Sequence, residues 1–98
     1  MATEREKEIA NTIRQQLFWG NAMMVLCWGA HGWMIMPRSD EFLGGLRFFV
    51  EGRKYKGKVD VMLDGSDTYT VLMDEREPHT DIYDEQLTEM IDYWVETD

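Results

Sequence analysis

Apolar residues recur every four positions near the start of the chain, at Ile9, Ile13 and Leu17. This spacing places them on one face of a helix. Thr3 and Glu6 match the capping box, in which the two side chains satisfy free amides at a helix start. Gly20 supplies an end signal. We therefore predict an amphipathic helix that ends at Gly20, with a thin apolar stripe that needs a sheet to pack on.

The middle of the chain has the pattern of strands joined by turns. A continuous apolar run indicates a buried first strand, alternating apolar and polar positions indicate half-buried strands after it, and Asp64-Gly65 is a hairpin signal between the last two. The expected strands cover residues 22–28, 46–50, 58–63 and 68–73. Residues 29–32 interrupt the first strand like a turn or bulge, and residues 33–36 either continue it or begin a return.

The last element has the 3.6-residue period of an amphipathic helix. Its apolar face consists of Tyr83, Leu87, Met90, Ile91, Trp94 and Val95. Thr80 or Asp81 is the expected N-cap. The order of one helix, about four strands and one helix predicts a single α+β domain over residues 1–98. Both helices are expected on one face of an antiparallel sheet.

Composition fits one small globular domain of the cytoplasm. The chain has 98 residues, of which 44% are hydrophobic, and its only cysteine is Cys27, as expected in a reducing compartment. The charged residues 4–8 lack the chemistry of a signal peptide. The most apolar stretch, residues 22–36, contains His31 and two glycines, whereas a membrane span needs about 20 apolar residues. We expect no membrane association.

The net charge is concentrated at the C-terminal end. Residues 74–98 hold ten acids and one base, and residues 1–73 hold nine of each, so the last segment accounts for the net charge of −9. Segregated charge steers association with an oppositely charged surface. We expect a basic protein as the partner. The acids expected to contact it are Asp81, Asp84, Glu85, Glu89, Asp92 and Glu96.

Four bases gather in the turn before the third expected strand. Arg53, Lys54, Lys56 and Lys58 surround Tyr55, and such a turn can contact phosphates while the ring stacks on a base. Repulsion from the acidic segment opposes this, because the Debye length of about 8 Å is a large fraction of so small a domain. A charged hairpin tip is also an ordinary solubility device. Nucleic acid is therefore the second choice of partner.

The chain has four tryptophans, which is many for 98 residues. Trp94 belongs to the apolar face of the last helix. Trp19, Trp28 and Trp33 lie near glycines, and they form either an exposed aromatic interface or packing beneath the first helix. A homodimer is the expected assembly, formed through apolar surfaces or by the basic turn of one copy against the acidic helix of another.

No residue pattern supports catalysis or metal binding. Cys27 and His31 could contribute at most two ligands, and structural zinc needs about four, with His79 as the only other histidine. The carboxylate-rich residues 74–81 lack the spacing and the glycine of a calcium loop. We expect no metal, no cofactor and no enzymatic activity.

Several short motifs resemble a widespread family of small phage and mobile-element proteins. They are Ile9-Ala10-Asn11-Thr12-Ile13-Arg14-Gln15-Gln16-Leu17, Gly29-Ala30, Asp67-Thr68-Tyr69 and Ile82-Tyr83-Asp84-Glu85-Gln86-Leu87. The chain departs from the family at Phe18-Trp19-Gly20, where the family has paired glycines, and at residues 28–32, where it has Thr-Gly-Ala-Lys-Asn. The resemblance carries no activity, but it implies a phage or mobile element in a bacterial cytoplasm.

The leading hypothesis is a non-enzymatic interaction protein. Its acidic final helix would dock on a basic host protein and inhibit it, in the manner of an anti-defence or anti-CRISPR protein. One alternative is a nucleic-acid-binding accessory protein that uses the turn from Arg53 to Lys58. Another is a structural or dimerisation module.

Overall fold

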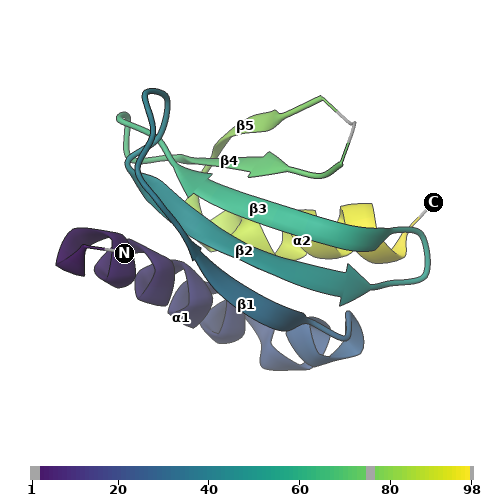
Figure 1. Cartoon of the computed structure of the whole chain (residues 1–98). Helices are drawn as coiled ribbons and strands as arrows, with labels where there is room; N and C mark the ends of the chain where they lie inside the picture. Colours follow the sequence, from purple (N-terminus) through teal and green to yellow (C-terminus); the bar gives the residue numbers. More distant parts are fainter. Residues whose placement is uncertain (1–2, 75–76, 98) are drawn as a thin grey trace.

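Two helices and one five-stranded sheet form two layers (Figure 1). The computed structural model describes residues 3–74 and 77–97. The elements in chain order are α1 (Glu4–Cys27), β1 (His31–Met36), β2 (Gly44–Glu51), β3 (Lys56–Leu63), β4 (Tyr69–Leu72), β5 (His79–Ile82), the 3₁₀ turn η1 (Asp84–Gln86) and α2 (Leu87–Glu96). The strands are antiparallel in the order β1-β2-β3-β4-β5. The predicted α+β class with terminal helices is confirmed, with five strands instead of about four.

The start of α1 is the predicted capping box. Thr3 N–H donates to Glu6 Oε1 at 2.7 Å, and Glu6 N–H donates to Thr3 Oγ1 at 3.2 Å. Arg38 N–H also donates to Glu6 Oε2, at 2.6 Å, so the loop after β1 is tied to the first turn. These hydrogen bonds, that from the Arg38 amide first, hold the pKa of Glu6 below its usual value.

The strand predicted over residues 22–28 is wrong, because α1 continues to Cys27. Asn21 has an extended backbone that kinks the helix, and its Oδ1 accepts the N–H of Met24 at 3.1 Å. Asn21 therefore caps a second helical segment, and Gly20 lies beside a kink instead of an end. The segment consists mainly of good helix formers, with Val25 as its only β-branched residue.

The C-terminal part of the chain also differs from the prediction. Residues 79–82, expected to form the end of a loop and the start of the last helix, form the edge strand β5, so Thr80 and Asp81 lie in a strand and do not cap the last helix. In the sequence, Pro78 immediately before this strand favours a loop. In the fold, Asp81 has a positive φ of 58°. The turn η1 then leads into α2.

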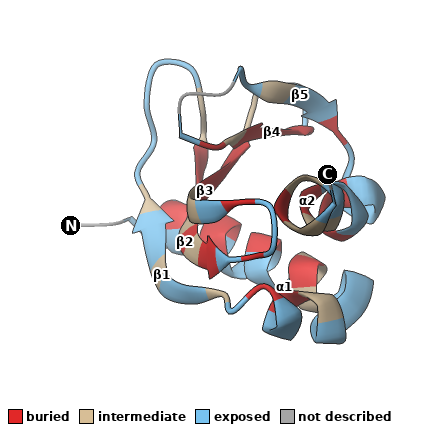
Figure 2. Ribbon diagram, turned by 90° about the vertical axis from the view of Figure 1, so that its right-hand side faces the viewer, coloured by how far each residue is buried: buried red, intermediate tan, exposed pale blue. Residues whose placement is uncertain are grey.

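The core lies between the sheet and the helices, where Figure 2 shows the buried residues gathered. The sheet contributes alternate residues, as the pattern predicted: Leu46, Phe48, Val50, Val59, Val61, Tyr69 and Val71 are all buried. The helices contribute Ile9, Ile13, Leu17, Val25, Leu87, Ile91 and Val95.

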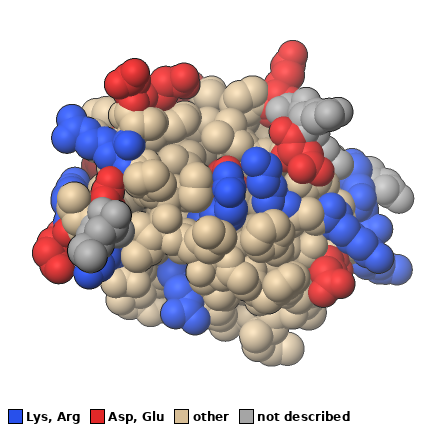
Figure 3. Space-filling view, viewed as in Figure 1, with Lys and Arg blue, Asp and Glu red and all other residues tan. Residues whose placement is uncertain are grey.

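The other face of the sheet carries no helix (Figure 1). Arg47 and Asp60 pair across β2 and β3, with Nε to Oδ1 at 2.7 Å and Nη2 to Oδ2 at 3.0 Å. Figure 3, viewed onto this face, shows a broad area of uncharged side chains with few charged ones among them. Met62 and Thr70, which face each other on this side, are buried although no second layer covers them.

Candidate functional site

The acids predicted to meet a partner occupy different environments. Asp81 in β5, Asp84 and Glu85 in η1, and Glu89 in α2 are exposed. We call these four residues the acidic surface. The ion pairs within residues 3–74 and 77–97 involve none of them. Their charge is therefore directed to solvent.

Asp92 has a structural task instead. Its Oδ1 accepts a hydrogen bond from Trp28 Nε1 at 2.9 Å. Trp28 is fully buried, with 0% of its surface exposed, and it stacks on Phe48. A buried indole N–H needs an acceptor, and Asp92 supplies the acceptor for this core side chain. Trp28 consequently offers no surface to a partner.

The basic turn is hydrogen-bonded to the C-terminal end of α2. The N–H groups of Lys54 and Tyr55 both donate to Val95 O, at 2.9 and 3.1 Å. The turn thereby places its bases beside the negative end of the helix dipole. Tyr55 is 6% exposed and donates its hydroxyl to Lys58 O, so its ring cannot serve as the predicted stacking surface. Arg53, Lys54 and Lys56 are exposed, and Lys58 and Glu96 are half-buried.

The three tryptophans of the predicted aromatic interface do not form one exposed surface. Trp33 is half-buried, and its ring centroid lies 4.8 Å from that of Phe48. The Arg14 guanidinium lies 5.2 Å from the Trp33 ring. Trp19, by contrast, is 83% exposed. It makes no ring-stacking or cation–π contact with the part of the chain that the structure describes.

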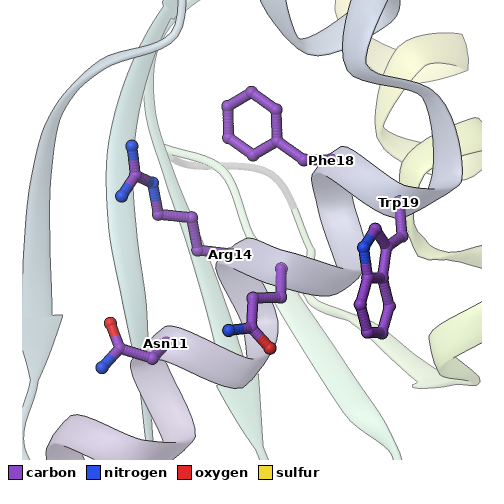
Figure 4. A pocket seen from close by; sticks show the side chains of 5 residues that line it. Asn11, Arg14, Phe18 and Trp19 are labelled. Atoms are coloured by element: carbon purple, nitrogen blue, oxygen red, sulfur yellow. The ribbon is translucent and has the colours of Figure 1, made fainter.

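Trp19 stands between two hollows. The first, which we call the α1 hollow, measures about 390 Å³ and is lined only by α1 residues, namely Asn11, Arg14, Gln15, Phe18 and Trp19. Figure 4 shows Arg14 and Trp19 at opposite ends of it. The second, which we call the acidic hollow, measures about 190 Å³ and is lined by Gln16, Trp19, Gly20, Asp84 and Glu85.

A close contact between the helices forms the acidic hollow. Thr88 Oγ1 donates to Leu17 O at 2.9 Å. A Cβ on Gly20 would lie 2.2 Å from Thr88 Oγ1, so only glycine permits this approach. The contact brings η1 and its two acids beside Trp19.

Gln16, one of the residues that line the acidic hollow, links the hollow to Tyr69. Tyr69 donates its hydroxyl to Gln16 Oε1 at 2.5 Å. Burial, and after it the charge of Asp84, raises the pKa of Tyr69 to about 12. The charge of Asp84, which lines the acidic hollow, therefore opposes the ionisation of Tyr69.

The sequence pattern did not predict that Arg14, Gln16 and Phe18 line hollows of the surface. The available signal was their position on α1, outside the Ile9–Ile13–Leu17 stripe. The acidic hollow depends on the Gly20–Thr88 contact, which links residues far apart in the chain and leaves no local pattern.

None of the three residues weighed as zinc ligands belongs to a metal-binding group of the described chain. Cys27 and His31 are exposed, and His79 stacks on Trp94 with ring centroids 3.8 Å apart. Within residues 3–74 and 77–97 no group of three or more histidine, cysteine or acidic side chains could hold a metal ion. The loop of residues 74–81 is described only in part, because residues 75 and 76 lie outside the described residues.

No family model, curated protein or solved structure matches this chain. Within the described chain, neither helix has the length and hydropathy that crossing a bilayer requires.

Proposed function

We propose that this protein is a non-enzymatic binding module that docks its acidic surface on a basic protein. The observation that carries the proposal is a set of four exposed carboxylates that form no ion pair with another described residue, two of which line a hollow beside an exposed tryptophan. Carboxylates of this kind raise the rate of encounter with a cationic surface. Exposed tryptophan is a frequent centre of binding energy in protein interfaces.

We also propose where the protein acts and what its binding does there. The resemblance to small phage and mobile-element proteins supports a bacterial cytoplasm as the place where the protein acts. Binding there would block a basic host protein, for example the nucleic-acid site of a defence nuclease. No enzymatic step is part of this proposal.

Charge reversal tests the proposal directly. In Asp84→Lys/Glu85→Lys/Glu89→Lys, the acidic surface becomes basic while Asp92 keeps its bond to Trp28. The control is Asp40→Lys/Glu41→Lys/Glu77→Lys, which changes the net charge equally at exposed positions elsewhere. Each chain is used to capture proteins from a bacterial lysate at about 50 and about 300 mM salt.

We expect the parent and the control to retain the same basic protein at low salt and to lose most of it at high salt. The acidic-surface variant should fail to retain it at either salt. Circular dichroism confirms that all three chains are folded. An unchanged partner set in the acidic-surface variant would refute the proposal.

The nucleic-acid alternative has less support. The basic turn keeps three exposed bases, but burial of Tyr55 removes the stacking ring on which that reading depended.

A further inference from the structure

The surface around Trp19 points to the chemistry of the partner segment, on the premise that the proposed function holds. We infer that Trp19 is the docking centre. Its occupant is a protein segment that presents an arginine or lysine next to an apolar side chain. The cation enters the acidic hollow, and the apolar side chain enters the α1 hollow on the other side of the Trp19 ring.

The exposure of Trp19 follows from the phase of α1. Ile13 and Leu17 face the sheet, so the residue two positions after Leu17 points to the opposite side of the helix. Transfer of an exposed indole from water into an apolar contact is favourable. A partner that covers the Trp19 ring gains this free energy on binding, so Trp19 is expected to contribute strongly to affinity.

The acidic hollow matches a cationic side chain in two respects. The Trp19 ring can accept a cation on its face, and arginine or lysine is the side chain that does so. Asp84 and Glu85 add charge-assisted hydrogen bonds. The backbone turn that carries both acids is closed by two hydrogen bonds: the amide of Tyr83 donates to Gln86 Oε1 at 3.2 Å, and the amide of Gln86 donates to Tyr83 O at 3.0 Å.

The α1 hollow matches an apolar side chain. The Arg14 guanidinium lies over the rings of Phe18 and Trp33, at 5.6 and 5.2 Å from their centroids. Its charge is thereby partly satisfied within the protein. All lining residues belong to one helix, so the hollow is a surface groove and suits a protruding side chain better than an enclosed small molecule.

The test uses the full chain and blocked synthetic peptides. The probe is an alanine-based helical peptide with one leucine and one arginine four positions apart. One matched peptide replaces the arginine with glutamate, and another replaces the leucine with serine. The readout is the nuclear magnetic resonance signal of the Trp19 indole N–H. The indole N–H of Trp28, which is bound to Asp92, serves as the internal control.

We expect the leucine–arginine peptide to shift the Trp19 signal saturably at about millimolar concentration, while the Trp28 signal stays in place. Each matched peptide should bind at least about tenfold more weakly. Trp19→Ala, which lacks this indole and is followed instead through the backbone amide signals of Asp84 and Glu85, should weaken binding by about tenfold or more, as a hot spot does. Met23→Ala, which removes another exposed side chain of α1 outside both hollows, should leave binding unchanged.

The outcomes separate this inference from the proposed function. A Trp19 signal that does not move, or that moves equally with the glutamate peptide, overturns the inference. The same holds if Trp19→Ala retains the salt-sensitive lysate partner that the acidic-surface variant loses, although the proposed function then stands. If the acidic-surface variant also keeps that partner, the proposed function falls.

Discussion

At the scale of single residues, acids of equal formal charge have different roles. Asp84, Glu85 and Glu89 are exposed, whereas Asp92 accepts the N–H of a buried tryptophan. A sequence pattern reports only that all of them lie on the polar side of a helix. The partner of Asp92 is Trp28, 64 positions earlier in the chain, so this role is visible only in the folded protein.

Removing the acceptor should destabilise the fold. In Asp92→Ala, the buried indole N–H of Trp28 loses its partner, and we expect the free energy of unfolding to fall by about 1–3 kcal/mol. Glu89→Ala, on the same helix, should change it by less than about 0.5 kcal/mol. Urea unfolding followed by tryptophan fluorescence measures both values. Equal values for the two variants would contradict the role assigned to Asp92.

Tyr69 should make stability depend on pH in the alkaline range. Its pKa is raised from the ordinary 10.0 to about 12 by burial and by the charges of Asp84 and Asp67. The folded chain therefore holds this proton more tightly than the unfolded chain. Its contribution to stability is complete below about pH 10 and is lost as the pH rises through about 12.

The variant Tyr69→Phe isolates this effect, because phenylalanine does not ionise. We expect the difference in unfolding free energy between parent and variant to shrink from about pH 9 to about pH 12. Urea unfolding at several pH values in this range gives the difference. A constant difference would show that Tyr69 does not titrate with folding.

At the scale of elements, the sequence predicts what is local. The capping box starts α1, and alternation places Leu46, Phe48 and Val50 in the core, as observed. Residues 22–27 were misassigned because a run of apolar residues fits a buried strand as well as a helix. Residues 79–82 were missed because pairing with β4, and not apolar alternation, makes them a strand.

The contact between the helices gives a prediction at this scale. In Gly20→Ala, the added methyl group would overlap Thr88, so the two helices must move apart. We expect a loss of about 1–3 kcal/mol in the free energy of unfolding. Gly65→Ala is the matched control, because a Cβ there meets nothing within 4 Å. Chemical unfolding compares the two, and a tolerated Gly20→Ala would argue against the close approach.

At the scale of the whole molecule, the two edges of the sheet differ. β5 follows Pro78 and contains Asp81 with its positive φ, and such features discourage pairing with another strand. β1 has no charged residue or proline within it, and Met34 and Ile35 are exposed. A bulge between His31 and Met34 interrupts the start of β1. Residues 34–36 are therefore the part of β1 that can pair with a strand of another copy.

We expect two copies to associate through β1. The basic turn is already bonded to α2 of its own chain, which disfavours the turn-to-helix mode. Light scattering during size exclusion should give a dimer mass at about 50 and about 500 mM salt, because apolar strand pairing is insensitive to screening. Ile35→Lys should give a monomer. The control Leu26→Lys, at an exposed position on α1, should remain a dimer. A parent monomer at both salts would refute the assembly.

The bond from Thr88 to Leu17 has a consequence for how the chain folds during synthesis. It joins residues 71 positions apart, and α2 is translated after every other element of this domain. Until α2 leaves the ribosome, the Leu17 side of α1 lacks its covering helix, and the nascent sheet keeps apolar surface open. Contacts of such long sequence separation form slowly, and open apolar surface invites aggregation. We therefore expect this domain to fold only once α2 has emerged, and a ribosome that stalls before Leu87 to leave a chain dependent on chaperones.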